Sequence, residues 1–297
     1  MTAPGIDAPA TDSGTSPSAT APRAARRRGR RATLAIGLTL TAFVVVVAAV
    51  SLVWLPYPLT DISGGRLSAP SLAHPLGTDR LGRDLLSQLM VGARIALTVG
   101  AGAVAIAAVL GTAIGLAAAF ARPWLDDTLS AGLDVVIAFP VLLLAMLVVA
   151  VQGPSLGSAI LAIGLAMSAV IARLTRILSR RVLQEQFVTA ARTSGTRTAG
   201  IVWHHILPNI APTLAVSLAL QFGVAVLAEA SLSYLGLGAP PPNASWGRML
   251  QEAQGTVLTA PVGAIAPGLA VIVLVLGVNF LADGLRDVTD PTRRRTR

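Results

Sequence analysis

The sequence predicts an all-α, polytopic membrane protein with six transmembrane helices. Of its 297 residues, 54% are hydrophobic and only 12% are charged, and the mean hydropathy is +0.71. Soluble domains carry about a quarter charged residues, so the low charge content indicates a membrane environment. Six apolar segments are long enough to cross about 30 Å of hydrocarbon, and arginine residues gather in the loops on one side of them.

The absence of two residue types excludes several chemistries. All 23 basic residues are arginine, and the chain has no cysteine. Without lysine there is neither a Walker A phosphate loop nor a Schiff-base enzyme, and without cysteine there is no thiolate site and no disulfide. We therefore expect no enzyme activity, no metal site and no cofactor in this chain; if ATP drives the protein, another subunit binds ATP and Mg. We expect no nucleic-acid partner.

The chain begins with a polar segment followed by an arginine run. Residues 1–22 consist mainly of Ala, Pro, Ser, Thr and Gly, and six arginines lie within residues 23–31. We expect residues 1–31 to form a disordered cytoplasmic tail. The apolar residues 32–55 follow, and we interpret them as an uncleaved signal anchor. A twin-arginine or secretory signal is the alternative, but the segment exceeds a signal-peptide core and no clear small-x-small cleavage site precedes Pro56.

Five further apolar segments define the rest of the organisation. A region covering residues 32–90 holds the first span and a polar external loop, residues 91–286 form the core transmembrane domain, and residues 287–297 form a cytoplasmic tail. The five segments are residues 91–121, 129–152, 156–174, 210–237 and 262–281.

Arginine positions predict the orientation. With the N-terminus in the cytoplasm, only Arg66, Arg80, Arg83 and Arg248 fall clearly outside, and Arg94 begins the second span. By the positive-inside rule, both termini and the insert at residues 184–209 are cytoplasmic. The arginines inside or at that border are Arg23, Arg26, Arg27, Arg28, Arg30, Arg31, Arg122, Arg173, Arg176, Arg180, Arg181, Arg192, Arg197, Arg286, Arg293, Arg294, Arg295 and Arg297.

The polar insert at residues 184–209 is the most informative segment. It contains a helical pattern, then Gly195, then a second short helical pattern that we expect Pro208 to stop. A connector between two membrane helices needs only a few polar residues. An insert with two short amphipathic helices indicates a surface that another protein holds.

Two patterns resemble catalytic motifs but favour simpler interpretations. Residues 153–157 fit G-x-S-x-G, yet a hydrolase elbow needs a strand before it, a helix after it and an activating histidine. We expect an outer turn there, which disfavours an intramembrane hydrolase. His204 and His205 are adjacent and therefore point about 100° apart on a helix, which does not suit a shared metal.

Glu229 is the deepest ionisable residue of the predicted spans, and Ser231 and Ser233 follow it. Unpaired charges inside a membrane are costly, so these three residues are candidates for the translocation path. A structural role, with Glu229 hydrogen-bonded between helices, fits equally well. A proton relay, as in a proton-driven secondary transporter, is less favoured, because the sequence shows no convincing internal repeat and no chain of carriers.

Two further patterns report packing and helix ends. Gly111 and Gly115 form a G-x-x-x-G pair, which permits close helix approach in lipid. The last span closes with a charged cytoplasmic helix end, in which Arg286 and Asp290 are spaced i, i+4. The candidate residues at this end are Asp283, Arg286 and Asp287.

Several motifs in order resemble one family. Residues 74–97 (HPLGTDRLGRDLLSQLMVGARIAL), residues 229–250 (EASLSYLGLGAPPPNASWGRML) and residues 279–291 (NFLADGLRDVTDP) resemble the C-type permease subunits of dipeptide, oligopeptide and nickel ABC importers. The insert resembles the coupling loop of binding-protein-dependent permeases, with Ala190, Ala191, Gly195, Leu207 and Pro208 in register. The similarity extends from the first span to Pro291.

The resemblance implies a type I ABC importer permease fold with cytoplasmic coupling helices. It implies a heterodimer with a second permease subunit, two cytoplasmic ATPases, an extracytoplasmic solute-binding protein and a peptide substrate, with nickel or another small solute as the alternative. The chain departs from the family at Thr189, where a Glu is usual, and at Ala131, where the family commonly has an Arg; we therefore expect Asp134 to lack its usual partner. The ATPase-coupling residues implied are Phe187, Thr189, Ala190, Ala191, Gly195, His205, Leu207 and Pro208.

Overall fold

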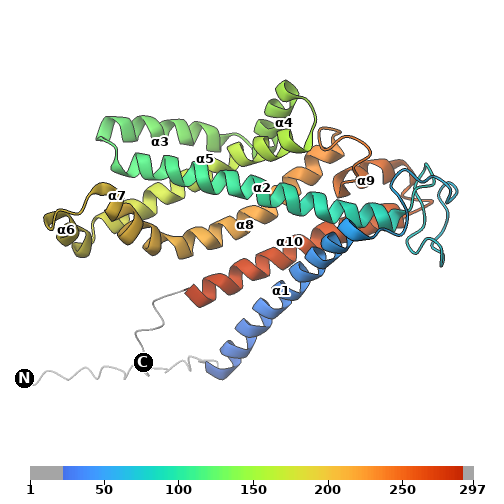
Figure 1. Cartoon of the computed structure of the whole chain (residues 1–297), viewed down its shortest axis with the longest axis horizontal. Coiled ribbons are helices and arrows are strands. Elements are labelled where there is room, and N and C mark those ends of the chain that lie inside the picture. Colours follow the sequence, from blue (N-terminus) through green and yellow to red (C-terminus); the bar gives the residue numbers. More distant parts are fainter. Residues whose placement is uncertain (1–22, 290–297) are drawn as a thin grey trace, which may run out of the picture.

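The computed structural model describes residues 23–289, with side chains from Ala32 to Arg286. This part of the chain is built from helices and contains no strand (Figure 1). The elements in order are α1 (Arg23–Val53), α2 (Leu85–Phe120), α3 (Pro123–Ala138), α4 (Val141–Gln152), α5 (Leu156–Leu183), α6 (Gln186–Thr193), α7 (Thr198–Ile201), the π-helical turn η1 (Val202–Ile206), α8 (Leu207–Tyr234), α9 (Trp246–Ala253), the 3-10 turn η2 (Gln254–Thr256) and α10 (Val262–Thr289).

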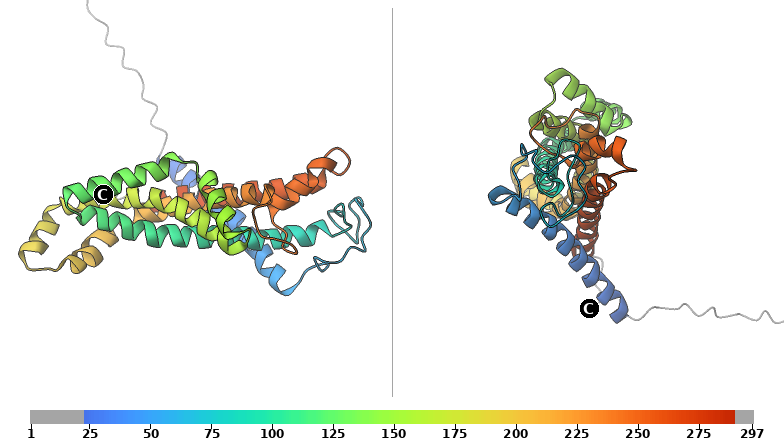
Figure 2. Two further views of the ribbon diagram at one scale, coloured as in Figure 1. Left: turned by 90° about the horizontal axis from the view of Figure 1, so that it is seen from above. Right: turned by 90° about the vertical axis from the view of Figure 1, so that its right-hand side faces the viewer.

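The long helices lie roughly along one direction and form a bundle with two distinct ends. Among the described residues, α1, α2, α5, α10 and the run from α7 through α8 are each long and apolar enough to cross a membrane. The small helices α6 and α7 lie at one end of the bundle, and the loop between α1 and α2 lies with α9 at the other (Figures 1 and 2). The chain is therefore a multi-pass membrane protein, as the composition predicts.

The third expected span is not one continuous helix, which corrects the prediction for residues 129–152. It consists of α3 and α4, which meet at an angle of 90°. Phe139 is extended (φ −84°, ψ 136°) and Pro140 precedes the first residue of α4. Proline disfavours the helical conformation in the residue before it, and with Phe139 extended α3 ends at Ala138. Counting the bent pair as one gives six spans.

Helices α1 and α2 both begin earlier than expected. The Asp84 side chain caps α2 by accepting a hydrogen bond from the Ser87 N–H at 2.7 Å. Helix α2 has 36 residues and is about 54 Å long, which exceeds the hydrocarbon thickness. Helix α1 starts at Arg23, so part of the predicted tail is helical; alanine and arginine are good helix formers and extend the helix toward the N-terminus. The expectation for residues 1–22 lies outside the described residues.

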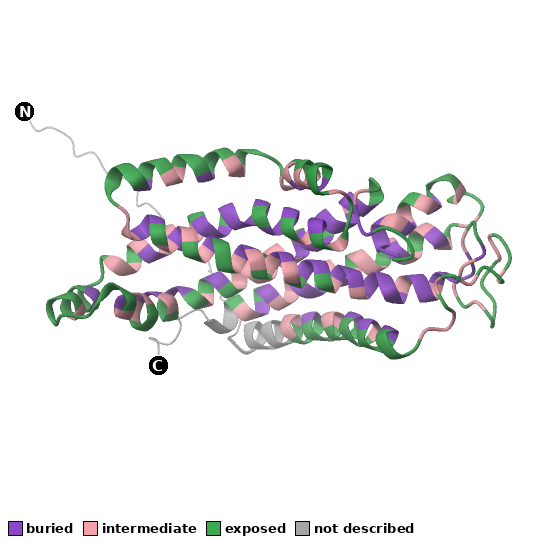
Figure 3. Ribbon diagram, turned by 45° about the horizontal axis from the view of Figure 1, so that its top comes forward, coloured by how far each residue is buried: buried purple, intermediate pink, exposed green. Residues whose placement is uncertain are grey.

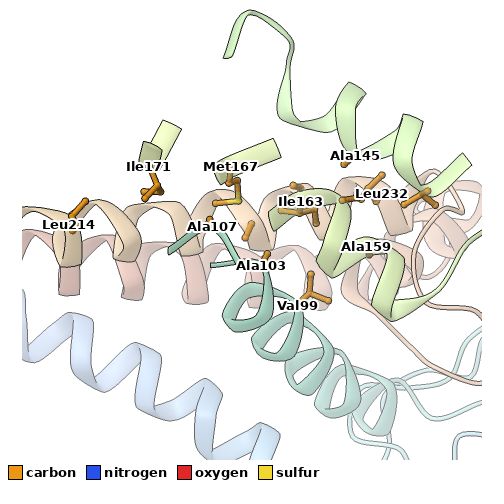
Figure 4. Packing of buried hydrophobic residues seen from close by; sticks show 14 of the residues in the cluster. Val99, Ala103, Ala107, Ala145, Ala159, Ile163, Met167, Ile171, Leu214 and Leu232 are labelled. Atoms are coloured by element: carbon orange, nitrogen blue, oxygen red, sulfur yellow. The ribbon is translucent and has the colours of Figure 1, made fainter. Parts of the chain in front are cut away.

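Small residues bring α2 and α5 together in the core. A Cβ atom on Gly111 would meet Ile171 and the carbonyl oxygen of Ser168, and one on Gly115 would meet the carbonyl oxygen of Ala172. The G-x-x-x-G pair thus serves packing within the chain. Around this contact lies the main buried cluster, which includes Val99, Ala103, Ala107, Ile163 and Met167 (Figure 4).

The two terminal helices form a second close pair. Glycines mediate the contact, because a Cβ on Gly37 would meet the α10 backbone and one on Gly277 would meet Thr41. A second buried cluster, including Val44 and Leu274, fills this side of the bundle. Much of the outer surface of α1, α4 and α10 remains exposed and carries large apolar side chains, as expected of helices that face lipid or other subunits (Figure 3).

Candidate coupling surface and polar sites

The insert between α5 and α8 forms a helical hairpin at one end of the bundle. Helix α6 covers Gln186–Thr193, and the chain reverses at Gly195, which has φ +82°. Glycine adopts this left-handed conformation without the penalty of a Cβ atom. The expected turn at Gly195 is therefore present between two short helices.

Buried β-branched residues anchor this hairpin to the bundle. Val188 of α6, Ile201 of α7 and Ile206 of η1 are buried, and all three belong to the main core cluster together with Ile210 of α8. The hairpin is thus packed onto the ends of the spanning helices. Any force on it acts on a packed element and not on a loose loop.

Outside these buried contacts the hairpin is exposed and partly aromatic. Phe187 is 44% exposed and Trp203 is 69% exposed, and Thr189 and Ala190 are exposed beside them in sequence. We call Phe187, Thr189, Ala190 and Trp203 the coupling surface. Of the other residues that the resemblance implies, Gly195 and Pro208 are exposed, whereas Ala191, His205 and Leu207 are half-buried.

Pro208 does not stop the second helical pattern, which corrects the prediction. The helical run continues without interruption from Thr198 to Tyr234 and has 37 residues. Pro208 lies inside this run, directly after the turn η1, and the run continues beyond it. The preceding turn η1 widens to a π-helix, in which the Leu207 N–H bonds to the Val202 carbonyl oxygen. The second short helix is therefore the N-terminal end of one long helix that continues through α8.

The two histidines stay separate, as expected from their spacing. His204 Nδ1 lies 3.1 Å from the carbonyl oxygen of Gly200. The His205 ring lies against the Phe187 ring, with 5.9 Å between their centroids. Within the described residues, no group of three or more His, Cys, Asp and Glu side chains suits a metal.

The three candidate path residues do not lie together. Glu229 is 1% exposed, and its Oε1 accepts a hydrogen bond of 2.6 Å from the Ser233 hydroxyl on the same helix. Ser245, the residue before α9, also interacts with this carboxylate. Ser231 points elsewhere: its hydroxyl donates to the Leu227 carbonyl oxygen at 2.8 Å, and it lines a shallow groove beside Tyr234. Their assignment to the path stays a prediction.

The charged end of α10 is only partly described. Asp283 and Arg286 are exposed, whereas the side chains of Asp287 and Asp290 lie outside the described residues. The helix continues to Thr289, which is eight residues beyond the expected end of the span at Leu281. The role of this end stays a prediction.

Asp134 has a partner, which corrects the expectation that the absence of an arginine at Ala131 leaves it alone. Arg173 NH1 on α5 lies 3.0 Å from Asp134 Oδ1, and both side chains are more than half exposed. A stronger pairing lies nearby on the same two helices: the Arg176 guanidinium binds both carboxylate oxygens of buried Asp126. These ion pairs hold α3 against α5.

A network of charges joins the loop between α1 and α2 to α9 at the other end of the bundle. Asp79 Oδ2 accepts hydrogen bonds from Arg83 Nε at 2.6 Å and from Gln88 Nε2 at 3.0 Å. Arg83 NH2 donates to Glu252 Oε2 at 2.7 Å, and Arg248 Nε donates to Glu252 Oε1 at 2.9 Å. We call this region, residues 54–84 with α9, the outer layer.

A second polar cluster fixes the start of α2 in the same layer. The buried Asp84 carboxylate caps the helix through the Ser87 N–H and lies 3.0 Å from His74 Nδ1. The His74 ring in turn lies against Tyr57, with 4.5 Å between the ring centroids. The motif at residues 74–97 thus specifies the folding of the outer layer, a role that sequence reasoning did not assign to these residues.

Comparison with known proteins defines the class. Residues 111–295 match the family described as the binding-protein-dependent transport system inner membrane component. The chain belongs to this family and is a permease subunit of such a transport system.

Similar proteins extend the match over most of the chain. The chain is 39% identical over 255 residues to the dipeptide transport system permease protein DppC of Alkalihalophilus pseudofirmus, which covers 86% of this chain and 84% of that protein. It is 41% identical over 272 residues to a putative peptide transport system permease protein of Brucella suis biovar 1, covering 90% of each. It is 39% identical over 268 residues to the glutathione transport system permease protein GsiD of Escherichia coli O6:K15:H31, covering 89% and 88%.

Proposed function

We propose that this chain forms half of the translocation pathway of an ATP-driven importer for short peptides. It pairs with a second permease subunit, two cytoplasmic ATPases bind ATP and Mg, and an extracytoplasmic binding protein delivers the peptide. The names of the similar permeases support peptides as the substrate class. The chain itself catalyses no reaction and needs no cofactor of its own.

The distribution of arginine supports an orientation in a bacterial cell membrane with both termini in the cytoplasm. Arg173, Arg176, Arg180 and Arg181 lie in the last turns of α5, directly before the hairpin that carries the coupling surface. By the positive-inside rule this end of the bundle faces the cytoplasm, where ATPases reside. The outer layer then faces the binding protein.

The unbroken helix from Thr198 to Tyr234 is the observation that carries the mechanism. A partner that moves the coupling surface moves the inner end of a rod that crosses the membrane. Shifting inward-facing to outward-facing states from 1:99 to 99:1 requires about 5.5 kcal/mol of differential binding. A packed helix transmits such a difference, whereas a flexible loop dissipates it. Closure of the ATPases therefore tilts α8 and changes the access of the pathway.

Two alternatives remain distinct from this proposal. The same machinery with nickel or another small solute as cargo changes the substrate but not the mechanism. A proton-driven secondary transporter changes the class, and it needs several ionisable groups along the path. Glu229 is buried and accepts a hydrogen bond from Ser233, which does not favour a proton-driven transporter.

The deciding experiment is uptake by the complete importer in proteoliposomes. A labelled dipeptide should accumulate with ATP and binding protein, and substitution of the Walker A lysine in the partner ATPases should abolish accumulation. Collapse of the proton gradient with a protonophore should leave uptake unchanged. Uptake that survives the ATPase substitution but is lost when the proton gradient collapses contradicts the proposal. If the importer transports nickel and not dipeptides, the proposed substrate is wrong but the mechanism stands.

A further inference from the structure

A partly enclosed cavity lies within the outer layer. It opens between the loop at residues 67–80, the first turn of α2, and the segment from α9 through η2 to the start of α10. Its empty volume is about 700 Å³ with the open mouth included. Most of its wall is apolar, with Leu67, Leu76, Leu85, Met249 and Val262 among the lining residues.

The backbone of the cavity wall is held in an unusual conformation at Leu67. Among the described residues Leu67 is the non-glycine residue with positive φ, at +53°. Its N–H donates to the Asp79 carbonyl oxygen at 2.9 Å, and Ser68 beside it bonds through its N–H to the Thr78 hydroxyl. Such a conformation is unfavourable for a residue with a side chain and persists where surrounding contacts enforce it. The wall is therefore a fixed surface.

The charges around the cavity do not cancel. Asp79 and Glu252 both line it, and both are bonded to Arg83, with Arg248 as the second partner of Glu252. Arg80 also lines the cavity; it is exposed, and its guanidinium has no hydrogen-bond acceptor or ion-pair partner in the part of the chain that the structure describes. The guanidinium lies against Gly255, because a Cβ atom there would collide with Arg80 NH2.

An unpaired guanidinium beside an apolar wall suits one kind of ligand. Guanidinium groups bind carboxylates through two parallel hydrogen bonds, and the apolar wall favours a hydrocarbon side chain next to the carboxylate. The C-terminal residue of a short peptide combines these two features. The enclosed shape fits the end of a small ligand better than the broad surface of a folded protein.

We propose that this cavity binds the C-terminal end of a short peptide, with Arg80 binding the terminal carboxylate. The site is formed within one chain and lies in the outer layer, where a delivered peptide first meets the permease. The inference rests on the proposed peptide transport and orientation, and it adds a specific binding site and a specific chemical group of the substrate.

The test is peptide binding to the purified importer in nanodiscs without its binding protein, measured by calorimetry with the dipeptide Val-Leu and with its C-terminal amide. The free acid should bind at least tenfold more tightly than the amide. Arg80→Gln should weaken binding of the free acid at least tenfold and abolish the preference over the amide. Gly255→Ala, which displaces the guanidinium, should weaken binding in the same direction.

Matched controls separate the site from general damage. Arg122→Gln removes an exposed arginine at the other end of the bundle, and Leu72→Ala removes a fully exposed side chain of the outer layer that does not line the cavity. Both should bind Val-Leu like the unmodified importer. Each variant should also retain the thermal unfolding temperature of the unmodified importer, which excludes misfolding as the cause.

Three results would overturn the inference. One is the absence of saturable Val-Leu binding, another is equal binding of acid and amide, and the third is an Arg80→Gln variant that binds Val-Leu normally. If Arg80→Gln weakens the binding protein's affinity for the importer but leaves Val-Leu binding unchanged, the cavity holds a side chain of the binding protein instead. ATP-dependent uptake measured on the same preparation tests the proposed function separately, because uptake without a peptide site in this cavity refutes only the site.

Discussion

Arg176 on α5 donates two parallel hydrogen bonds to Asp126 on α3, from Nε to Oδ1 at 2.5 Å and from Nη2 to Oδ2 at 2.7 Å. Arg180 adds a contact of 2.6 Å to Oδ2. The carboxylate is almost fully buried, whereas the arginines are partly exposed. This contact holds the first half of the bent third span against the core, so its loss should loosen α3.

Asp126→Asn should lower the stability of the chain, because it leaves two guanidinium groups facing a neutral amide. Removing one partner of a buried hydrogen-bonded charge costs about 1–3 kcal/mol. The measurement is thermal unfolding of the purified importer. Asp127→Asn is the matched control, because Asp127 is exposed. Equal unfolding temperatures for the two variants would show that the pair of Asp126 and Arg176 does not contribute to stability.

Gly195→Pro should uncouple ATP hydrolysis from uptake. Proline fixes φ near −65°, whereas the hairpin turn needs +82°. The variant should remain in the membrane with the rest of the importer, hydrolyse ATP and take up less than about a tenth of the peptide, an energetic loss of about 1.4 kcal/mol in coupling. Gly195→Asn should retain uptake, since asparagine tolerates this conformation. Normal uptake by the proline variant would refute the proposed transmission of ATPase movement through the hairpin.

Trp203→Ser should weaken the association with the ATPases. A large, exposed aromatic side chain on a docking surface is typical of the few residues that carry most of an interface's energy, about 2 kcal/mol or more each. The measurement is the amount of ATPase that co-purifies with the permease. Trp124→Ser provides the control, because Trp124 on α3 is 67% exposed and Trp203 is 69% exposed. If both variants lose the ATPases equally, or neither does, Trp203 is not part of the docking site.

Gly115→Ala should destabilise the bundle, whereas Gly132→Ala should not. The new Cβ at Gly115 meets the backbone oxygen of Ala172, which cannot move without shifting α5. Overpacking of this kind costs about 1–3 kcal/mol. At Gly132, inside α3, a Cβ meets nothing within 4 Å and alanine is the better helix former. A thermal unfolding comparison in which Gly115→Ala is as stable as Gly132→Ala would contradict the close packing.

Glu229→Gln should retain peptide uptake within about twofold if the carboxylate only accepts the Ser233 hydrogen bond, since an amide oxygen accepts it equally well. Glu229→Leu should lower stability by about 1–3 kcal/mol, because it leaves the buried Ser233 hydroxyl without its acceptor. Uptake assays and thermal unfolding measure the two effects. Loss of uptake in the glutamine variant at normal stability would support a role of Glu229 in the translocation path.

The sequence predicted the class, the number of spans and the turn at Gly195, because these depend on composition and on local conformation. It did not predict the break in the third span, although Pro140 was visible. Pro212 and Pro267 lie inside α8 and α10 without ending them. The same residue type thus has two outcomes, and the choice depends on the packing of neighbouring helices.

Contacts between distant residues were also beyond the sequence. The absence of an arginine at Ala131 suggested an unpaired Asp134, yet Arg173 reaches it from α5. Trp203 went unnoticed because a tryptophan in a helical pattern is usually buried; a polar, arginine-bearing neighbourhood was the available signal. The continuity of α7, η1 and α8 escaped prediction because a proline normally marks a helix boundary.

The bond between Arg83 and Glu252 spans 169 positions of the chain. During synthesis Arg83 leaves the ribosome long before Glu252 exists, so this ion pair cannot form until all but the last helix has been made. Until then the segment at residues 54–84 stays open to proteases and chaperones. A nascent chain halted after α8 should therefore be cut there by an added protease, whereas the full-length chain should resist.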